Sequence, residues 1–162
     1  MLRITRTPIV VERLVRAVRA RGAGAIVTFV GTTRDHNAGR RVMRLEYEAF
    51  APMAVAEMRR LAARATRRWR LEKVAMVHRI GRVPVGQASV AIAVSAAHRV
   101  EAFAACHWLI DRLKEIVPIW KREHFPGGRV WIGPQVTPPR DFVSKRRRAV
   151  SVARRRRTTK AT

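Results

Sequence analysis

Residues 25–31 read AIVTFVG, a continuous run of apolar and β-branched residues that ends at a glycine and follows another glycine at position 24. A short run of this kind predicts a buried strand. The next residues, TTRDHNAG at 32–39, are polar and indicate a loop. Ligands of α/β proteins usually bind at the carboxyl ends of strands, which makes Arg34 a candidate site residue. A role as an exposed surface arginine stays open, because the chain has 35 basic residues.

The segment before this strand predicts an amphipathic helix at residues 9–20. Apolar residues recur at helical spacing after Pro8, and two glycines end the pattern. These apolar residues are Val10, Val11, Leu14, Val15 and Val18. Leu2–Thr5 is predicted to form a short strand before the helix.

The segment after the loop predicts two regions of strand separated by a long helix. The helical pattern begins at Pro52 and has an outer face rich in arginine. Pro84 and Gly86 predict a turn that joins the last two strands as a hairpin. In order, the predicted elements are a strand at 42–47, a helix at 52–69 and strands at 73–80 and 88–95.

A third helix is predicted because apolar residues again fall on one stripe: Phe103, Cys106, Ile110, Leu113 and Val117. Pro118 ends this helix, since proline disfavours the helical conformation in the residue before it. IWKRE, from residue 119, and RVWIG, from residue 129, predict two further strands.

Length and charge predict one basic domain followed by a tail. A chain of 162 residues fits a single core, and its 35 Lys and Arg against 11 Asp and Glu give a net charge of +24. Residues 140–162 hold ten basic residues and one acid, so +9 belongs to this segment and +15 to the rest. We predict a domain at 1–139 and a basic, mostly disordered tail at 140–162. The charge favours anionic partners of any kind.

Cysteine and histidine usage predicts neither a disulfide framework nor a metal site. Cys106 is the single cysteine, and the five histidines show no metal-binding spacing. The first twenty residues are interrupted by charges, and no apolar run reaches membrane-spanning length. We therefore expect a soluble, cytoplasmic protein without a bound metal.

Two further clusters are candidates for chemistry. His98 and Arg99 lie where a strand passes into a helix, and the free N–H groups of a helix start bind phosphate. Lys114 lies beside the apolar stripe of the third helix, where an amine suits proton transfer or acyl chemistry. Lys121 shares a strand face with Glu123. The alternatives stay open: a solvated helix start, a lysine stem that covers the core edge, and an exposed lysine paired with Glu123.

Three stretches together identify a family resemblance. FVGTTRDHN at 29–37, SAAHR at 95–99 and LKEIVPIWKREHF at 113–125, in this order and spacing, resemble molybdopterin synthase large (catalytic) subunits. EYEAFAPMA at 46–54 and VAMVHRIGRVPVGQASV at 74–90 support the resemblance, which spans residues 2–133. The basic tail is no part of the shared pattern.

The resemblance implies an α+β domain of the α/β hammerhead type, with a mixed or antiparallel sheet and about three helices. It implies a sulfurtransferase that needs no metal or organic cofactor. The sulfur would come from the C-terminal thiocarboxylate of a small ubiquitin-like carrier subunit and pass to cyclic pyranopterin monophosphate, forming the dithiolene of molybdopterin. The assembly would be a heterotetramer around a homodimer of this chain.

The resemblance also implies roles for single residues. Lys114 would be the principal catalytic lysine and Lys121 its partner. The substrate-binding set would be Thr32, Thr33, Arg34, His98, Arg99, Lys121, Arg122 and Glu123, with His98 and Arg99 reaching across the dimer interface. Thr32 stands where other members can carry a basic residue, which is a departure from the pattern.

The sequence leaves two other functional hypotheses open. Blocks of arginine bind nucleic acid without a shaped pocket, although the basic body lacks interleaved aromatics for base stacking. Any nucleic-acid binding is therefore expected only through the tail. The third hypothesis is a non-catalytic scaffold, which keeps the fold and binds the carrier but does not turn over substrate.

Overall fold

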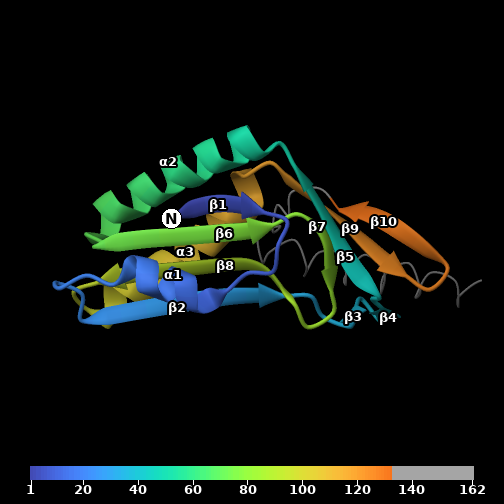
Figure 1. Cartoon of the computed structure of the whole chain (residues 1–162), viewed down its shortest axis with the longest axis horizontal. Helices are drawn as coiled ribbons and strands as arrows, with labels where there is room; N and C mark the ends of the chain where they lie inside the picture. The colour runs from blue at the N-terminus through green and yellow to red at the C-terminus, as the bar shows by residue number, and fades with distance from the viewer. Residues whose placement is uncertain (133–162) are drawn as a thin grey trace, which may run out of the picture.

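The computed structural model describes residues 1–132, so the predicted tail at 140–162 and the predicted domain end at 139 lie outside the described residues. Two four-stranded sheets form the framework, and Figure 1 shows the second at one end of the first. The first sheet has the order β1-β6-β8-β2, made of Leu2–Thr5, Lys73–Arg79, Ala88–Ala96 and Ala25–Thr32. β1 runs parallel to β6, and the other pairs are antiparallel.

Three helices cover the two faces of the first sheet. α1 (Val11–Val18) packs on one face through Leu14 and Val18. α2 (Ala51–Trp69) and α3 (Arg99–Ile116) pack on the other face and form the larger core. The predicted helices and strands are thus confirmed, as is the α+β class with three helices in the described residues.

The second sheet is antiparallel throughout and has the order β10-β9-β5-β7. Its strands are Gly128–Ile132, Ile119–Phe125, Arg44–Ala49 and Gly81–Pro84. A short ribbon of β3 (His36–Asn37) and β4 (Arg40–Arg41) lies within and just after the segment predicted as a loop. This second sheet places β9, with its lysine, beside the end of β2.

The connection between β6 and β8 differs from the sequence prediction. β6 and β8 do pair antiparallel, but the chain between them first forms β7, which joins the second sheet. Gly81 (φ 79°) and Gly86 (φ 80°) adopt left-handed backbone at the two ends of this excursion, where glycine is tolerated best. The link is therefore a crossover between sheets and not a simple hairpin turn.

Burial corrects two predictions. β2 was expected to be a buried strand, but it is an edge strand with alternating burial, and Ile26 and Val30 are 39% and 38% exposed. Phe103 was expected on the buried stripe of α3 but is 63% exposed. The stripe that packs is formed instead by Ala102, Ala105, Cys106, Leu109, Ile110 and Leu113. Both corrections leave apolar side chains at one edge of the domain.

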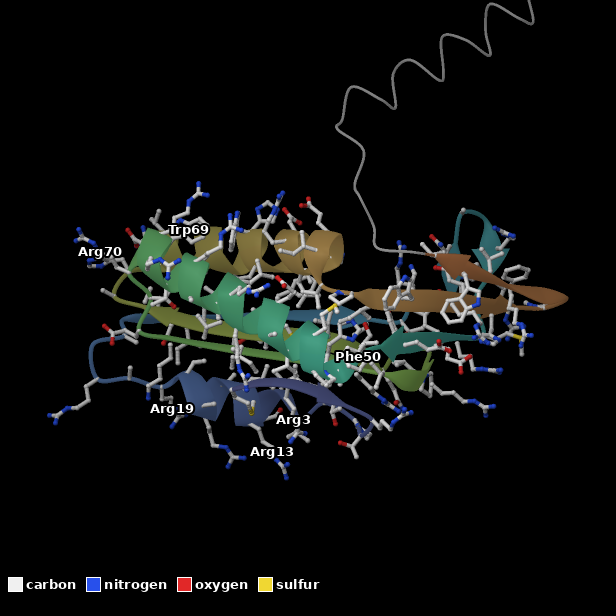
Figure 2. All side chains as sticks on the ribbon, turned by 90° about the horizontal axis from the view of Figure 1, so that it is seen from above. Arg3, Arg13, Arg19, Phe50, Trp69 and Arg70 are labelled. Atoms are coloured by element: carbon white, nitrogen blue, oxygen red, sulfur yellow. The ribbon has the colours of Figure 1, made fainter. Side chains whose placement is uncertain are left out.

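Within residues 1–132, several exposed arginines lie on α1, on β1 and at the end of α2. Figure 2 shows Arg3, Arg13 and Arg19 projecting outward on the α1 side and Arg70 at the end of α2, and all four are exposed. Arg70 ends α2 in a left-handed conformation (φ 50°, ψ 46°). None of the helices in residues 1–132 combines the length and apolar character that crossing a membrane requires.

Candidate active site

A cavity of about 280 Å³ lies where the two sheets meet the end of α3. The end of β2, the strands β5 and β9, and the last turn of α3 supply its walls. Its polar lining consists of Thr32, Arg34, His36, Asn37, Tyr47, His78, Ser89, Lys114, Lys121 and Glu123, and apolar residues such as Phe29, Leu45 and Val90 complete it. Residues from distant parts of the chain thus converge on one space.

Pro118 brings the two predicted lysines to this cavity. It ends α3, and Val117 already has extended backbone (φ −75°, ψ 125°), so the chain turns directly into β9. Lys114 lies in the last helical turn and is exposed, whereas the side chain of Lys121 on β9 is only 18% exposed. Both line the cavity. A lysine in the last turn also complements the helix dipole.

Lys121 is held by a carboxylate inside the cavity. Its Nζ lies 3.0 Å from Oε1 of Glu123, whose side chain is 10% exposed. Nδ2 of Asn37 donates to both carboxylate oxygens, at 3.0 and 2.8 Å. Burial opposes the ionisation of Glu123 most strongly, but these hydrogen bonds and the charges of Lys121 and Arg34 outweigh it and lower its pKa. Glu123 therefore stays ionised and holds the lysine.

Arg34 approaches the same group from the loop after β2. One of its guanidinium nitrogens, Nη2, donates to Oδ1 of Asn37 at 3.4 Å, and Arg34 is exposed at the cavity. The sequence groups Asn37 with Arg34, Asp35 and His36 as a suggestive loop cluster, and in the structure the Asn37 amide links Arg34 to Glu123. Nothing in its local pattern distinguishes it from a surface asparagine, because its partner is 86 residues away.

The structure separates Thr32 from Thr33. Thr32 lines the cavity, whereas Thr33 is 2% exposed and is not part of the lining. The backbone N–H of Thr33 donates to Gln87 O at 3.0 Å, and its carbonyl accepts from the N–H of Gly86 at 2.8 Å. Thr33 thus fixes the strand end that presents Thr32 and Arg34.

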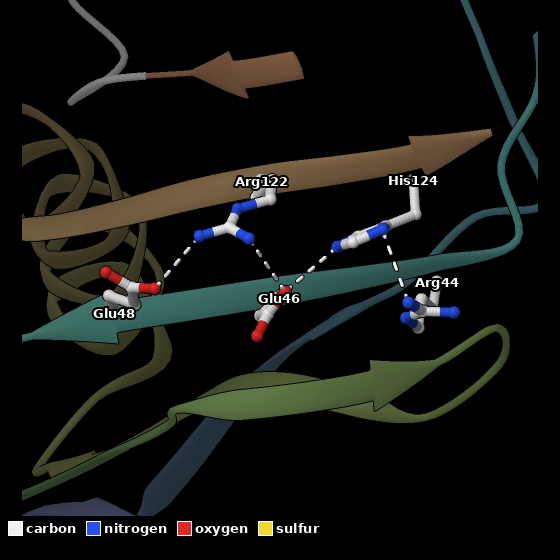
Figure 3. Close-up of polar contacts among 5 residues, drawn as sticks. All are labelled: Arg44, Glu46, Glu48, Arg122 and His124. Atoms are coloured by element: carbon white, nitrogen blue, oxygen red, sulfur yellow. Dashed lines mark hydrogen bonds and ion pairs between the residues drawn. The ribbon is translucent and has the colours of Figure 1, made fainter. Parts of the chain in front are cut away.

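Arg122 lies on the opposite face of β9 from Lys121. Figure 3 shows it between Glu48, at 3.2 Å, and Glu46, at 3.6 Å, and its guanidinium covers the ring of Trp131 at 4.0 Å. Glu46 also bonds His124 at 2.9 Å, and this bond is the main cause of its lowered pKa. Arg122 was predicted to bind substrate, but the structure does not bring it to the cavity. It joins β9 to β5 instead.

His98 and Arg99 lie at the other end of the first sheet. Ala96, two residues before His98, pairs with Ala25 at the start of β2, whereas Thr32 at its end pairs with Ala88. A strand of this length separates the two ends by roughly 25 Å. His98 caps α3 with extended backbone (φ −128°, ψ 156°). One chain therefore does not bring these residues to its own cavity.

Three polar cavity residues were missed by the sequence reasoning: Tyr47, His78 and Ser89. His78 and Ser89 are buried, and Ser89 Oγ donates to Gly31 O at 3.1 Å. The rings of Tyr47 and His78 meet edge to face with centroids 4.9 Å apart. Burial raises the pKa of Tyr47, against the opposing effect of the Ser89 hydroxyl. A signal existed, since His78 and Ser89 interrupt otherwise apolar strands.

The cavity suits anion chemistry more than metal chemistry. Three cationic side chains, Arg34, Lys114 and Lys121, share it with one carboxylate. Within residues 1–132, no cluster of three or more His, Cys, Asp or Glu side chains is arranged to hold a metal ion. Such a set of donors can bind phosphate and stabilise developing negative charge.

Comparison with known proteins gives consistent results. The family model described as "MoaE protein" matches residues 4–116. The molybdopterin synthase catalytic subunit of Bacillus subtilis is 47% identical over 133 residues, covering 82% of this chain and 85% of the relative. A crystal structure of molybdopterin synthase from Staphylococcus aureus aligns with a TM-score of 0.79 and 36% identity, covering 82% and 96% of the two chains.

A more distant structure has the same fold. It is a protein–protein complex of subunits 1 and 2 of the molybdopterin-converting factor from Helicobacter pylori, with a TM-score of 0.67 and 22% identity. The aligned parts cover 80% of this chain and 88% of that one.

Proposed function

This chain belongs to the MoaE protein family, whose relatives are molybdopterin synthase catalytic subunits, and we propose that its cavity transfers sulfur from a small carrier subunit to cyclic pyranopterin monophosphate. The observation that carries this proposal is the convergence of Lys114 and Lys121, with Arg34, on one cavity. Two lysines on separate surfaces could not act on one substrate. Thr32 and Glu123 complete the proposed binding set within one chain.

The donors in the cavity match the charges of this reaction. Each transfer replaces a carbon–oxygen bond of the precursor by a carbon–sulfur bond. It also breaks the acyl–sulfur bond of the carrier, whose glycine takes up an oxygen from water and leaves as a carboxylate. Phosphate, thiocarboxylate and carboxylate are all anions, and a partly enclosed site strengthens their attraction to fixed cations. Lys114 is proposed as the catalytic amine, and Lys121, oriented by Glu123, as its partner.

The partner is proposed to be a ubiquitin-like carrier that delivers its C-terminal tail into the cavity. The Helicobacter pylori complex, named as two subunits of a converting factor, supports a small-subunit partner. Because Lys114 and Arg34 are exposed, an extended chain can reach them from solvent. Two carriers and two copies of this chain would make the proposed heterotetramer, in the cytoplasm.

The proposed homodimer is supported by the edge of the first sheet. β2 has no strand neighbour on its outer side within the described residues, and unpaired edges are usually covered. Exposed apolar side chains lie beside it: Ile26 and Val30 on β2, and Val100 and Phe103 on α3, which packs against β2. A second copy placed on this edge could bring its His98 and Arg99 to a neighbouring cavity.

Phe103→Asp is expected to weaken dimerisation about 100-fold or more, because a two-fold interface buries the changed side chain twice. Light scattering after size-exclusion chromatography would show monomers at micromolar concentration. Phe50→Asp is the matched control, since Phe50 is 62% exposed at the start of α2 (Figure 2). Dimers that persist in Phe103→Asp would place the interface elsewhere.

Reconstitution tests the proposed activity directly. Purified chain, thiocarboxylated carrier and cyclic pyranopterin monophosphate are expected to yield the dithiolene product, with two carriers consumed per precursor. A chain that ends at residue 139 is expected to react at the same rate, because the proposed domain ends there. Carrier binding without product would instead support the non-catalytic scaffold.

A further inference from the structure

The cavity has two chemically different ends. Arg34 and Lys114 are exposed at one end, so two of the three cationic groups of the cavity face the entrance. His78 and Ser89, each 5% exposed, lie at the buried end, where Val90 pairs with His78. Tyr47, in edge-to-face contact with His78, closes this end from the side of β5. A ligand that fills the cavity therefore meets two exposed cations at its outer part and, at its inner part, uncharged side chains beside the Lys121–Glu123 ion pair.

The fold fixes the position of His78 firmly. Its backbone lies in β6, in register with Ile4 on β1 and with Val90 on β8. Met76, two residues earlier on the same face, is fully buried in the core beneath α2 and α3. His78 is thus the point at which the core-facing side of the sheet stops being core and becomes cavity.

The hydrogen bonding of the ring fixes its tautomer. Nδ1 lies 2.9 Å from the carbonyl oxygen of Arg79, which can only accept, so Nδ1 carries the proton. Burial lowers the pKa of His78 to about 4, so the ring is neutral near pH 7. A neutral ring with a proton on Nδ1 has a free lone pair on Nε2. Within residues 1–132 the bond to Arg79 is the single hydrogen bond of this ring.

We propose that Nε2 of His78 accepts a hydrogen bond from a ring N–H or amino group of the substrate, which sets the heterocycle at the buried end and the phosphate at the cationic end. This inference rests on the proposed function, since it takes the pterin precursor as the ligand. A phosphate diester cannot satisfy Nε2, because its oxygens and Nε2 are all acceptors. A flat ring with N–H donors satisfies both the lone pair and the apolar walls.

The assignment makes His78 a specificity-determining residue and not a proton donor. A site that offers an acceptor to a ligand N–H discriminates against ligands that lack it, because the buried acceptor is then left unpaired. The extended tail of a carrier protein also has N–H groups that can donate to Nε2, which makes it the competing occupant of the buried end. The experiment must therefore separate the two substrates.

The test compares steady-state kinetics of two variants in the reconstituted reaction. His78→Phe keeps an aromatic ring against Tyr47 but has no acceptor, and His78→Gln supplies a carbonyl oxygen near the position of Nε2. His78→Phe is expected to raise KM for the precursor about tenfold, with KM for the carrier unchanged, and His78→Gln to restore most of the loss. An unchanged precursor KM, or a raised carrier KM alone, overturns the proposal.

A second measurement needs no variant. The ¹⁵N resonances of the His78 ring in the wild-type chain are expected to show Nε2 unprotonated, and Nε2 is expected to shift when pterin itself, without phosphate, is added. A proton on Nε2, or no shift at saturating pterin, overturns the proposal even if the variants fail to fold. If the wild-type chain makes product but the Nε2 resonance of His78 does not shift with pterin, this inference alone is wrong. If the wild-type chain makes no product, the proposed function is wrong.

Discussion

Lys114→Ala is expected to reduce turnover of the pterin precursor about 10²- to 10⁴-fold, which is the range for loss of a positioned acid–base group. Lys114 is exposed in the last turn of α3, and the backbone hydrogen bond from Val117 N–H to Leu113 O closes that turn without its side chain. The variant should therefore fold and dimerise normally, because surface substitutions outside special features change stability by only about 0.5 kcal/mol. Single-turnover assays with preloaded carrier separate chemistry from binding.

Lys73→Ala is the matched control for this experiment. It removes the same charge from an exposed lysine whose Nζ bonds the carbonyl of Arg19, on the far side of the sheet from the cavity. Its rate should equal that of the wild type. Normal turnover by Lys114→Ala in a correctly folded dimer would show that the assigned amine takes no part in the reaction.

The sequence predicted the positions of the helices and strands better than their burial and their pairing. Periodicity located the helices and strands because it reports local backbone geometry. It could not show that β2 lies at an edge, which depends on strand pairing, or that Phe103 is exposed, which depends on how α3 lies over the sheet. The same limit explains β7: four residues between two strands join the second sheet only because β5 offers a free edge there.

The candidate site was predictable where one local feature controls the geometry. Pro118 ends α3 and directs β9 past it, which is why Lys114 and Lys121 converge. Arg122 shows the opposite case, because strand alternation sends neighbouring side chains to opposite faces and only the pairing with β5 shows which face holds the cavity. His78 was missed since its partner Tyr47 comes from a distant segment.

His98 and Arg99 are predicted to bind substrate, but their position in the fold does not explain how they reach it. They lie at the far end of the first sheet from the cavity of their own chain, yet an arginine at a helix start is well suited to a phosphate. The double variant His98→Ala with Arg99→Ala is expected to raise KM for the precursor about 10- to 100-fold, as loss of charge-assisted hydrogen bonds predicts. An unchanged KM would remove the pair from the site.

A mixed dimer decides whether the pair acts across the interface. One subunit carries Lys114→Ala and the other the His98/Arg99 double variant, each with its own affinity tag for purification. If each subunit lends His98 and Arg99 to its partner, both defects fall in one cavity and the second is intact, so activity should recover to about half that of the wild-type dimer. If the pair serves its own chain, each cavity keeps one defect and the rate stays near that of the parents. Subunit exchange during the assay would re-form the two parent homodimers and change the measured rate. Chromatography or covalent cross-linking after turnover must therefore show that the mixed dimer is intact.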